Sequence, residues 1–68
     1  SMSTVTLTVP NISCGHCVNT IQRELKMVAG VADVKADAQT KQVVLDVQDE
    51  ATLAEAKKTL LEIGYPPA

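Results

Sequence analysis

The 68-residue sequence has no Trp and no Phe, and Tyr65 is its one aromatic residue. Proteins that bind single-stranded nucleic acid normally stack the bases on aromatic side chains, and nucleic-acid binders in general present a basic surface. Here six Lys and Arg residues are scattered among eight Asp and Glu residues, which gives a net charge of -2. The composition therefore predicts that nucleic acid is not a partner of this protein.

Long apolar runs are also missing, so we expect no membrane insertion of this domain. The sequence shows no signal-peptide pattern, and we expect a cytoplasmic location unless the chain was excised from a longer protein. Ser1, which precedes Met2, is interpreted as a scar of tag removal and is left out of the fold argument. The length predicts a single domain over residues 1–68, near the lower limit for folding on one hydrophobic core.

Aliphatic residues make up most of the 46% hydrophobic content, and they follow two periodicities. Strict alternation of polar and apolar residues predicts strands, and a spacing of three to four residues predicts helices. In chain order, the predicted elements are a strand over 4–9, a helix from about 17 that stops at Gly30, a hairpin of strands over 31–36 and 42–47, and a helix after Thr52 that ends at Gly64.

The ends of the two helices also carry recognisable signals. Ser13 is a plausible N-cap of the first helix, and Thr52 with Glu55 matches the capping-box pattern at the start of the second. Gly30 and Gly64 fit the positions where helices commonly stop. We therefore expect the first helix to begin close to the segment that contains both cysteines.

The predicted order is typical of an α+β fold, the ferredoxin-like βαββαβ sandwich, in which two helices cover one face of an antiparallel sheet. After the second helix only a short tail is left, and Pro66 and Pro67 lack the N–H groups that a strand ladder needs. The last strand is therefore expected to be short or missing.

Cys14-Gly15-His16-Cys17 is the one chemically distinctive segment. Two thiols at this spacing can face one ion if the turn curls, and Gly15 is expected to permit the backbone angles of such a turn. Cys17 falls in the first turn of a predicted helix, where free N–H groups and the helix dipole favour a thiolate. Thiolates suit soft ions such as Cu(I), Hg(II) and Zn(II), although Zn(II) usually takes four ligands.

Two other interpretations of Cys14 and Cys17 stay open at this point. They can be inert, buried small side chains, or the pair of a small dithiol redox protein. The redox motif usually has Trp before it and Pro within it, and this chain has neither. No catalytic constellation is visible elsewhere, so we predict that the protein is not an enzyme.

His16 and Tyr65 are secondary candidates. His16 is interpreted first as an exposed residue, and alternatively as a third ligand or a bridging donor when two molecules share a metal ion. For Tyr65 two interpretations have equal weight. Its ring can cover the edge of the core, or its hydroxyl can donate toward a cysteine sulfur near the metal.

The segment Asn11-Ile12-Ser13-Cys14-Gly15-His16-Cys17, a helix, Gly30-Val31, a hairpin, a second helix and Gly64-Tyr65 together resemble the heavy-metal-associated domain family. The closest resemblance is to bacterial copper chaperones and to the N-terminal metal-binding domains of copper-transporting P-type ATPases. Ser13, Cys14 and Cys17 match the family motif Met-Ser-Cys-x-x-Cys. Ile12 stands where Met is usual, and we expect Ile12 to pack in its place and, with Ser13 and Gly15, to support the loop.

The resemblance implies that Cys14 and Cys17 hold Cu(I) and pass it by ligand exchange to a copper-transporting P-type ATPase or to its metal-binding domain. It also implies roles for His16 and Tyr65, since bacterial copper members often have these residue types at these positions. Mercury-binding relatives share the two cysteines, and zinc-selective relatives often have an acidic residue where this chain has Ser13. Hg(II) or Zn(II) as the bound ion, and a homodimer bridged by metal, stay open as alternatives.

Overall fold

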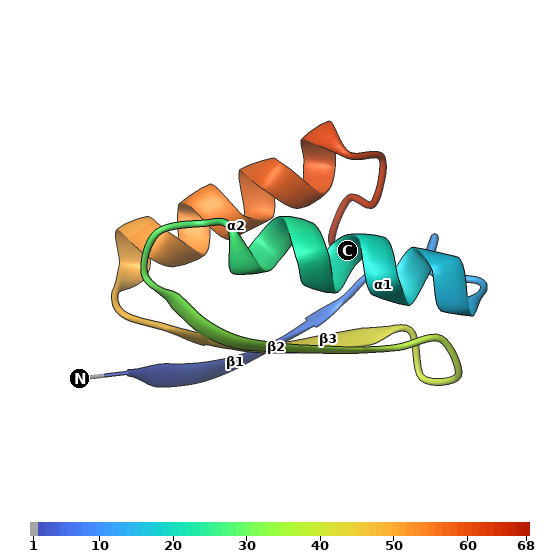
Figure 1. Cartoon of the computed structure of the whole chain (residues 1–68), viewed down its shortest axis with the longest axis horizontal. Helices are drawn as coiled ribbons and strands as arrows, with labels where there is room; N and C mark the ends of the chain where they lie inside the picture. The colour runs from blue at the N-terminus through green and yellow to red at the C-terminus, as the bar shows by residue number, and fades with distance from the viewer. Residues whose placement is uncertain (1) are drawn as a thin grey trace.

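The computed structural model describes residues 2–68; Ser1, interpreted above as a tag scar, lies outside the described residues. Two helices lie on the same face of a small sheet (Figure 1), which confirms the predicted α+β architecture. No helix within residues 2–68 is both long and apolar enough to cross a membrane. The elements are β1 (Ser3–Thr8), α1 (Gly15–Lys26), β2 (Val31–Asp37), β3 (Gln42–Val47) and α2 (Glu50–Glu62).

The sheet has the order β1-β3-β2, and both pairs of neighbouring strands are antiparallel. Thr8 pairs with Gln42 at the end of the sheet that leads to the cysteines, and Ser3 pairs with Val47 at the opposite end. No fourth strand forms within residues 2–68, in agreement with the expected effect of the two prolines. The tail adds one backbone hydrogen bond to β1, in which the Ala68 amide donates to the Thr8 carbonyl at 2.8 Å.

The core lies between the sheet and the helices and consists almost entirely of aliphatic side chains. The inward residues of the β2–β3 hairpin and the apolar stripes of both helices meet there, as the two periodicities predict. The buried hydrophobic residues are Val9, Ile12, Cys17, Ile21, Leu25, Val34, Ala36, Val43, Leu45, Val47, Ala56 and Leu60. Val9, Ile12 and Cys17 bring the segment around the cysteines into this core.

Both predicted N-caps are wrong. The N-cap of α1 is Cys14 rather than Ser13, and no side chain caps this helix. The N-cap of α2 is Asp49, whose Oδ1 accepts from the Thr52 amide and the Thr52 hydroxyl, each at 2.8 Å. A carboxylate that receives two donors stabilises the helix end better than the Thr52 hydroxyl can, and these bonds lower the pKa of Asp49. The helix α2 therefore begins at Glu50, before the predicted start.

Of the two glycines predicted to stop helices, Gly64 does so, and the prediction for Gly30 is wrong because α1 already ends at Lys26. Gly64, at φ +90°, directly follows the C-cap of α2 and ends that helix. Gly30, at φ +95°, lies beyond the C-cap of α1, which is Met27. A Cβ at Gly30 would clash with the Thr52 Oγ1, so a glycine at this position allows the α1–β2 connection to pass close to the start of α2.

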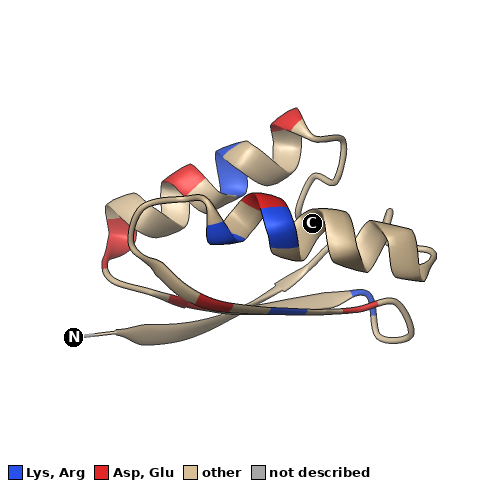
Figure 2. Cartoon of the chain, viewed as in Figure 1, with Lys and Arg blue, Asp and Glu red and all other residues tan. Residues whose placement is uncertain are grey.

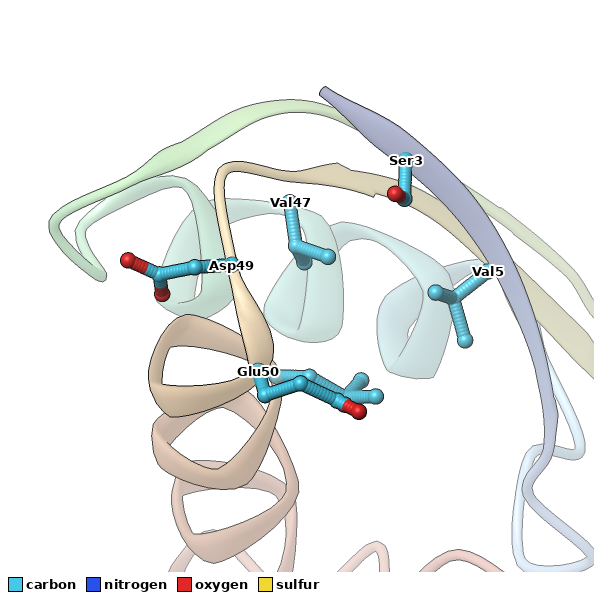
Figure 3. Close-up of a pocket in the computed structure, with 6 residues that line it drawn as sticks. Ser3, Val5, Val47, Asp49 and Glu50 are labelled. Carbon is cyan, nitrogen blue, oxygen red and sulfur yellow. The ribbon is translucent and has the colours of Figure 1, made fainter. Parts of the chain in front are cut away.

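A shallow hollow lies at the end of the molecule away from the cysteines (Figure 3). It opens between the start of β1, the end of β3 and the first turns of α2, and it is lined by Ser3, Val5, Val47, Asp49, Glu50 and Leu53. None of the candidate site residues lines this hollow. The site is therefore identified by its donor atoms rather than by concave shape.

Candidate metal centre

The cysteine loop, residues 9–17, connects β1 to the first turn of α1. Its first part is a tight turn across Pro10 and Asn11, closed by the Ile12 amide, which donates to the Val9 carbonyl at 3.2 Å. The side chains on both sides of this turn, Val9 and Ile12, are completely buried. The turn is thus anchored to the core at each end, with Ile12 packed as an apolar side chain immediately before Ser13 and Cys14.

The two thiols converge after this turn. Cys14 has extended backbone angles and is exposed, whereas Cys17 is buried in the first turn of α1. Their Sγ atoms are 3.4 Å apart, and both cysteines are free thiols rather than a disulfide, whose sulfurs would be about 2.05 Å apart. The loop therefore presents two sulfur donors to one point at the N-terminus of a helix.

The environment of Cys17 favours its charged form. The pKa of the Cys17 thiol is lowered from the ordinary 9.0 to about 6, chiefly by a hydrogen bond from the Tyr65 hydroxyl and then by the Ser13 backbone amide and the Cys14 thiol. Burial opposes this shift but is the weaker effect. The same contact raises the pKa of Tyr65. At neutral pH Cys17 is therefore mainly a thiolate, the form that binds soft metal ions.

The end of α2 places Tyr65 beside Cys17. The Tyr65 amide donates to the Leu60 carbonyl at 2.8 Å and the Gly64 amide donates to the Leu61 carbonyl at 3.2 Å, which is the Schellman pattern of a helix C-terminus. The Asn11 side chain also donates to the Gly64 carbonyl at 3.3 Å, which ties the cysteine loop to this helix end. Tyr65 is half-buried and packs against the core, and its hydroxyl is also a hydrogen-bond partner of the Cys17 sulfur, so both interpretations of Tyr65 are compatible with the structure.

The other candidate residues of the site are His16, Ser13 and Gly15. His16 is exposed on the first turn of α1, and within residues 2–68 no group of three or more His, Cys, Asp or Glu side chains lies close enough together to hold a metal ion. The Ser13 hydroxyl lies 3.8 Å from the Cys17 sulfur. Gly15 begins α1 without a left-handed φ, and a Cβ there would contact nothing within 4 Å, so the expected conformational need for glycine was wrong.

One contact of the loop was not predicted from the sequence. The Lys41 ammonium, from the β2–β3 turn, donates to the Ile12 carbonyl. Lys41 stood in a stretch interpreted only as a polar turn, and it is far from the cysteines in sequence. No local pattern could have connected Lys41 with the loop.

Replacing Tyr65 with Phe is expected to raise the pKa of Cys17 above 6, toward the ordinary 9.0, because the largest stabilising contact of the thiolate is lost. The aromatic ring is kept, so packing changes little. The measurement is a pH titration of thiolate absorbance in the metal-free, reduced protein, with Cys14→Ala used to isolate the signal of Cys17. An unchanged midpoint in the Tyr65→Phe protein would show that the hydroxyl does not act on Cys17.

Comparisons with known proteins identify the family and the fold of the chain. The model of the family described as "Heavy-metal-associated domain" matches residues 6–66. The COP-associated protein of Helicobacter pylori strain J99 is 37% identical over 60 residues, which cover 88% of this chain and 91% of that protein. The mercuric transport protein periplasmic component of Pseudomonas aeruginosa is 34% identical over 64 residues, covering 93% and 70%. A solved structure of the CopZ metallochaperone has a TM-score of 0.87 at 25% identity, with 97% of this chain and 100% of that chain covered.

Proposed function

Because the chain belongs to the heavy-metal-associated domain family, we propose that it carries Cu(I) between the thiolates of Cys14 and Cys17 and passes the ion to a partner by ligand exchange. The observation that supports this most directly is the convergence of two sulfur atoms, 3.4 Å apart, at the start of α1. Two soft donors at one point suit a soft ion of low coordination number. The proposal places this carrier in the cytoplasm.

The unequal exposure of the two cysteines suits transfer of the ion. Cys14 is exposed at the N-cap of α1, whereas Cys17 is only 7% exposed. An incoming thiolate can approach the ion from the solvent side, replace the bond to Cys14 first, and replace the bond to Cys17 last. A low-coordinate ion leaves room for this attack, so strong binding and rapid transfer are compatible.

The proposed partner is a second domain with paired cysteines, such as the metal-binding domain of a copper-transporting P-type ATPase. Transfer between two such domains needs no redox change, since one Cu–S bond forms as another breaks.

The exposed His16, next to the two cysteines in the chain, is proposed as the donor that completes a metal-bridged homodimer in the absence of a partner. This role predicts that His16→Ala weakens dimerisation more than it weakens binding of the ion.

The test is an anaerobic titration of the reduced protein with Cu(I) against a chromophoric competing chelator, with Zn(II) run in parallel. We expect strong uptake of one Cu(I) per chain or per dimer and much weaker uptake of Zn(II), because Zn(II) usually requires four ligands. Weak Cu(I) binding would contradict the proposal and would direct attention to Hg(II), Zn(II) and dithiol redox chemistry.

Hg(II) is the second candidate ion, and a specific observation favours it. A relative 34% identical to this chain is a mercuric transport protein, and two thiolates suit Hg(II) as well as Cu(I). A competition experiment with both ions at physiological thiol concentration separates the two functions. Retention of Hg(II) together with loss of Cu(I) to the competing thiol would favour mercury as the cargo.

A further inference from the structure

Lys41 has a backbone conformation that its side chain does not favour. Its φ of +61° lies in the left-handed region, and among residues 2–68 it is the one residue other than glycine with a positive φ. Left-handed geometry is unfavourable for residues with a Cβ, and such outliers persist where the surrounding structure holds them. Glycine would adopt this angle without strain. A lysine at this position therefore indicates that its side chain has a structural role.

The β2–β3 turn holds Lys41 in this conformation. The Lys41 amide donates to the Asp37 carbonyl at 2.9 Å. The Asp37 carboxylate in turn accepts from the amides of Gln39 and Thr40, at 2.7 and 3.2 Å. The turn is thus fixed by its own hydrogen bonds, and Lys41 leaves it pointing toward the cysteine loop.

Lys41 contacts both ends of the tight turn in the cysteine loop. Its backbone carbonyl accepts from the Val9 amide at 2.8 Å, and its Nζ donates to the Ile12 carbonyl. Val9 and Ile12 are the two residues that the turn itself joins. One residue of the hairpin therefore clamps the turn from both sides, immediately before Ser13 and Cys14.

The segment around the turn that Lys41 holds contains no Lys, Arg, Asp or Glu. The first residue of these types in the sequence is Arg23, and Figure 2 shows β1, the loop and the first turns of α1 without Lys, Arg, Asp or Glu. The Ile12 carbonyl that accepts from Lys41 belongs to the same peptide group as the Ser13 amide, and the Ser13 hydroxyl lies 3.8 Å from the Cys17 sulfur. Because a peptide group is planar, fixing its oxygen also fixes the direction of its N–H.

We propose that Lys41 is a positioning residue for the metal centre: its carbonyl and its ammonium hold the Val9–Ile12 turn, and so fix the Ile12–Ser13 peptide that leads into Cys14. The consequence of this inference is tight Cu(I) binding by a preformed loop, and that consequence rests on the proposed function. The clamp itself is a property of the metal-free protein.

The test compares Lys41→Met, which keeps the apolar stem and loses the donor, with Lys41→Arg, which keeps a cationic donor. Lys35→Met removes an exposed lysine from the same hairpin and is the matched control. Amide hydrogen exchange is measured in the reduced, metal-free proteins, with Val43 and Leu45 in the central strand β3 as internal references. Cu(I) affinity is then measured by chelator competition.

In Lys41→Met we expect exchange at the Ile12 and Ser13 amides to be faster by about tenfold, and Cu(I) affinity to be weaker by about tenfold, as for loss of one charged hydrogen bond. Lys41→Arg and Lys35→Met should stay near the native values. Lys41→Gly relieves the backbone strain, which secures a folded variant, and it should show the same faster exchange at Ile12 and Ser13.

Three results would overturn the proposal: native exchange in Lys41→Met, equal acceleration in Lys41→Arg, or acceleration of the Val43 and Leu45 amides by the same factor. The last result would mean that Lys41 contributes only to global stability. If the native protein fails to bind Cu(I) tightly, the proposed function fails, but the exchange rates of the metal-free variants still decide the role of Lys41.

Discussion

Replacing either Cys14 or Cys17 with alanine is expected to abolish tight Cu(I) binding while the domain stays folded. Each substitution removes one of two sulfur donors that lie 3.4 Å apart. Loss of a residue that merely supports a ligand typically weakens metal affinity about 10- to 100-fold. Loss of a ligand itself should therefore weaken it on the order of a thousandfold or more, which corresponds to roughly 4 kcal/mol. Chelator competition with anaerobic Cu(I) measures this change.

The two variants should differ in stability, and this difference separates a binding defect from a folding defect. Cys14 is exposed, so Cys14→Ala should change the free energy of unfolding by no more than about 0.5 kcal/mol. Cys17 is part of the core, so Cys17→Ala should destabilise the metal-free protein by about 1 kcal/mol. Urea unfolding of both proteins provides the comparison. Full affinity in either variant would contradict the proposed ligand pair.

The elements of the fold could be predicted from the sequence because their signals are local. The alternation in β1 and β3 and the helical spacing in α1 and α2 survive in the structure, and the strand predicted over 42–47 has those bounds. The helix starts could not be predicted as well. Asp49 and Thr52 are both suitable caps in sequence, and only the extended backbone at Asp49 (φ -160°) decides between them.

The residues of the metal centre can likewise be separated into those that the sequence predicts and those that only the fold brings together. Cys14 and Cys17 are close in sequence, so their spacing and their place between a strand and a helix predicted that they would converge. Tyr65 reaches Cys17 only because Gly64 ends α2 in a specific conformation and turns the chain back. Lys41 reaches Ile12 across 29 positions through the hairpin. Contacts of this kind depend on the tertiary fold, and sequence periodicity carries no information about them.

The second large effect is expected at Ile12, which is completely buried beside the cysteines. Ile12→Ala should destabilise the metal-free protein by about 2–5 kcal/mol, because it removes buried methylene groups and leaves a cavity. A domain of this length has a total stability of roughly 3–10 kcal/mol, so the loss is a large part of it. Ile12→Met conserves the volume more closely and should lose less than about 1.5 kcal/mol. Urea unfolding of the reduced proteins measures both effects.

Added Cu(I) distinguishes a weakened core from a lost metal centre in these variants. An ion that binds only the folded state stabilises it in proportion to the logarithm of its concentration relative to the dissociation constant. If Ile12 only anchors the loop, Cu(I) should raise the unfolding midpoint of Ile12→Ala by nearly as much as it raises that of the native protein. A much smaller rise would mean that Ile12 also holds the cysteines in their binding geometry. In that case Ile12→Met, which restores the type of side chain usual in the family, should recover most of the native rise.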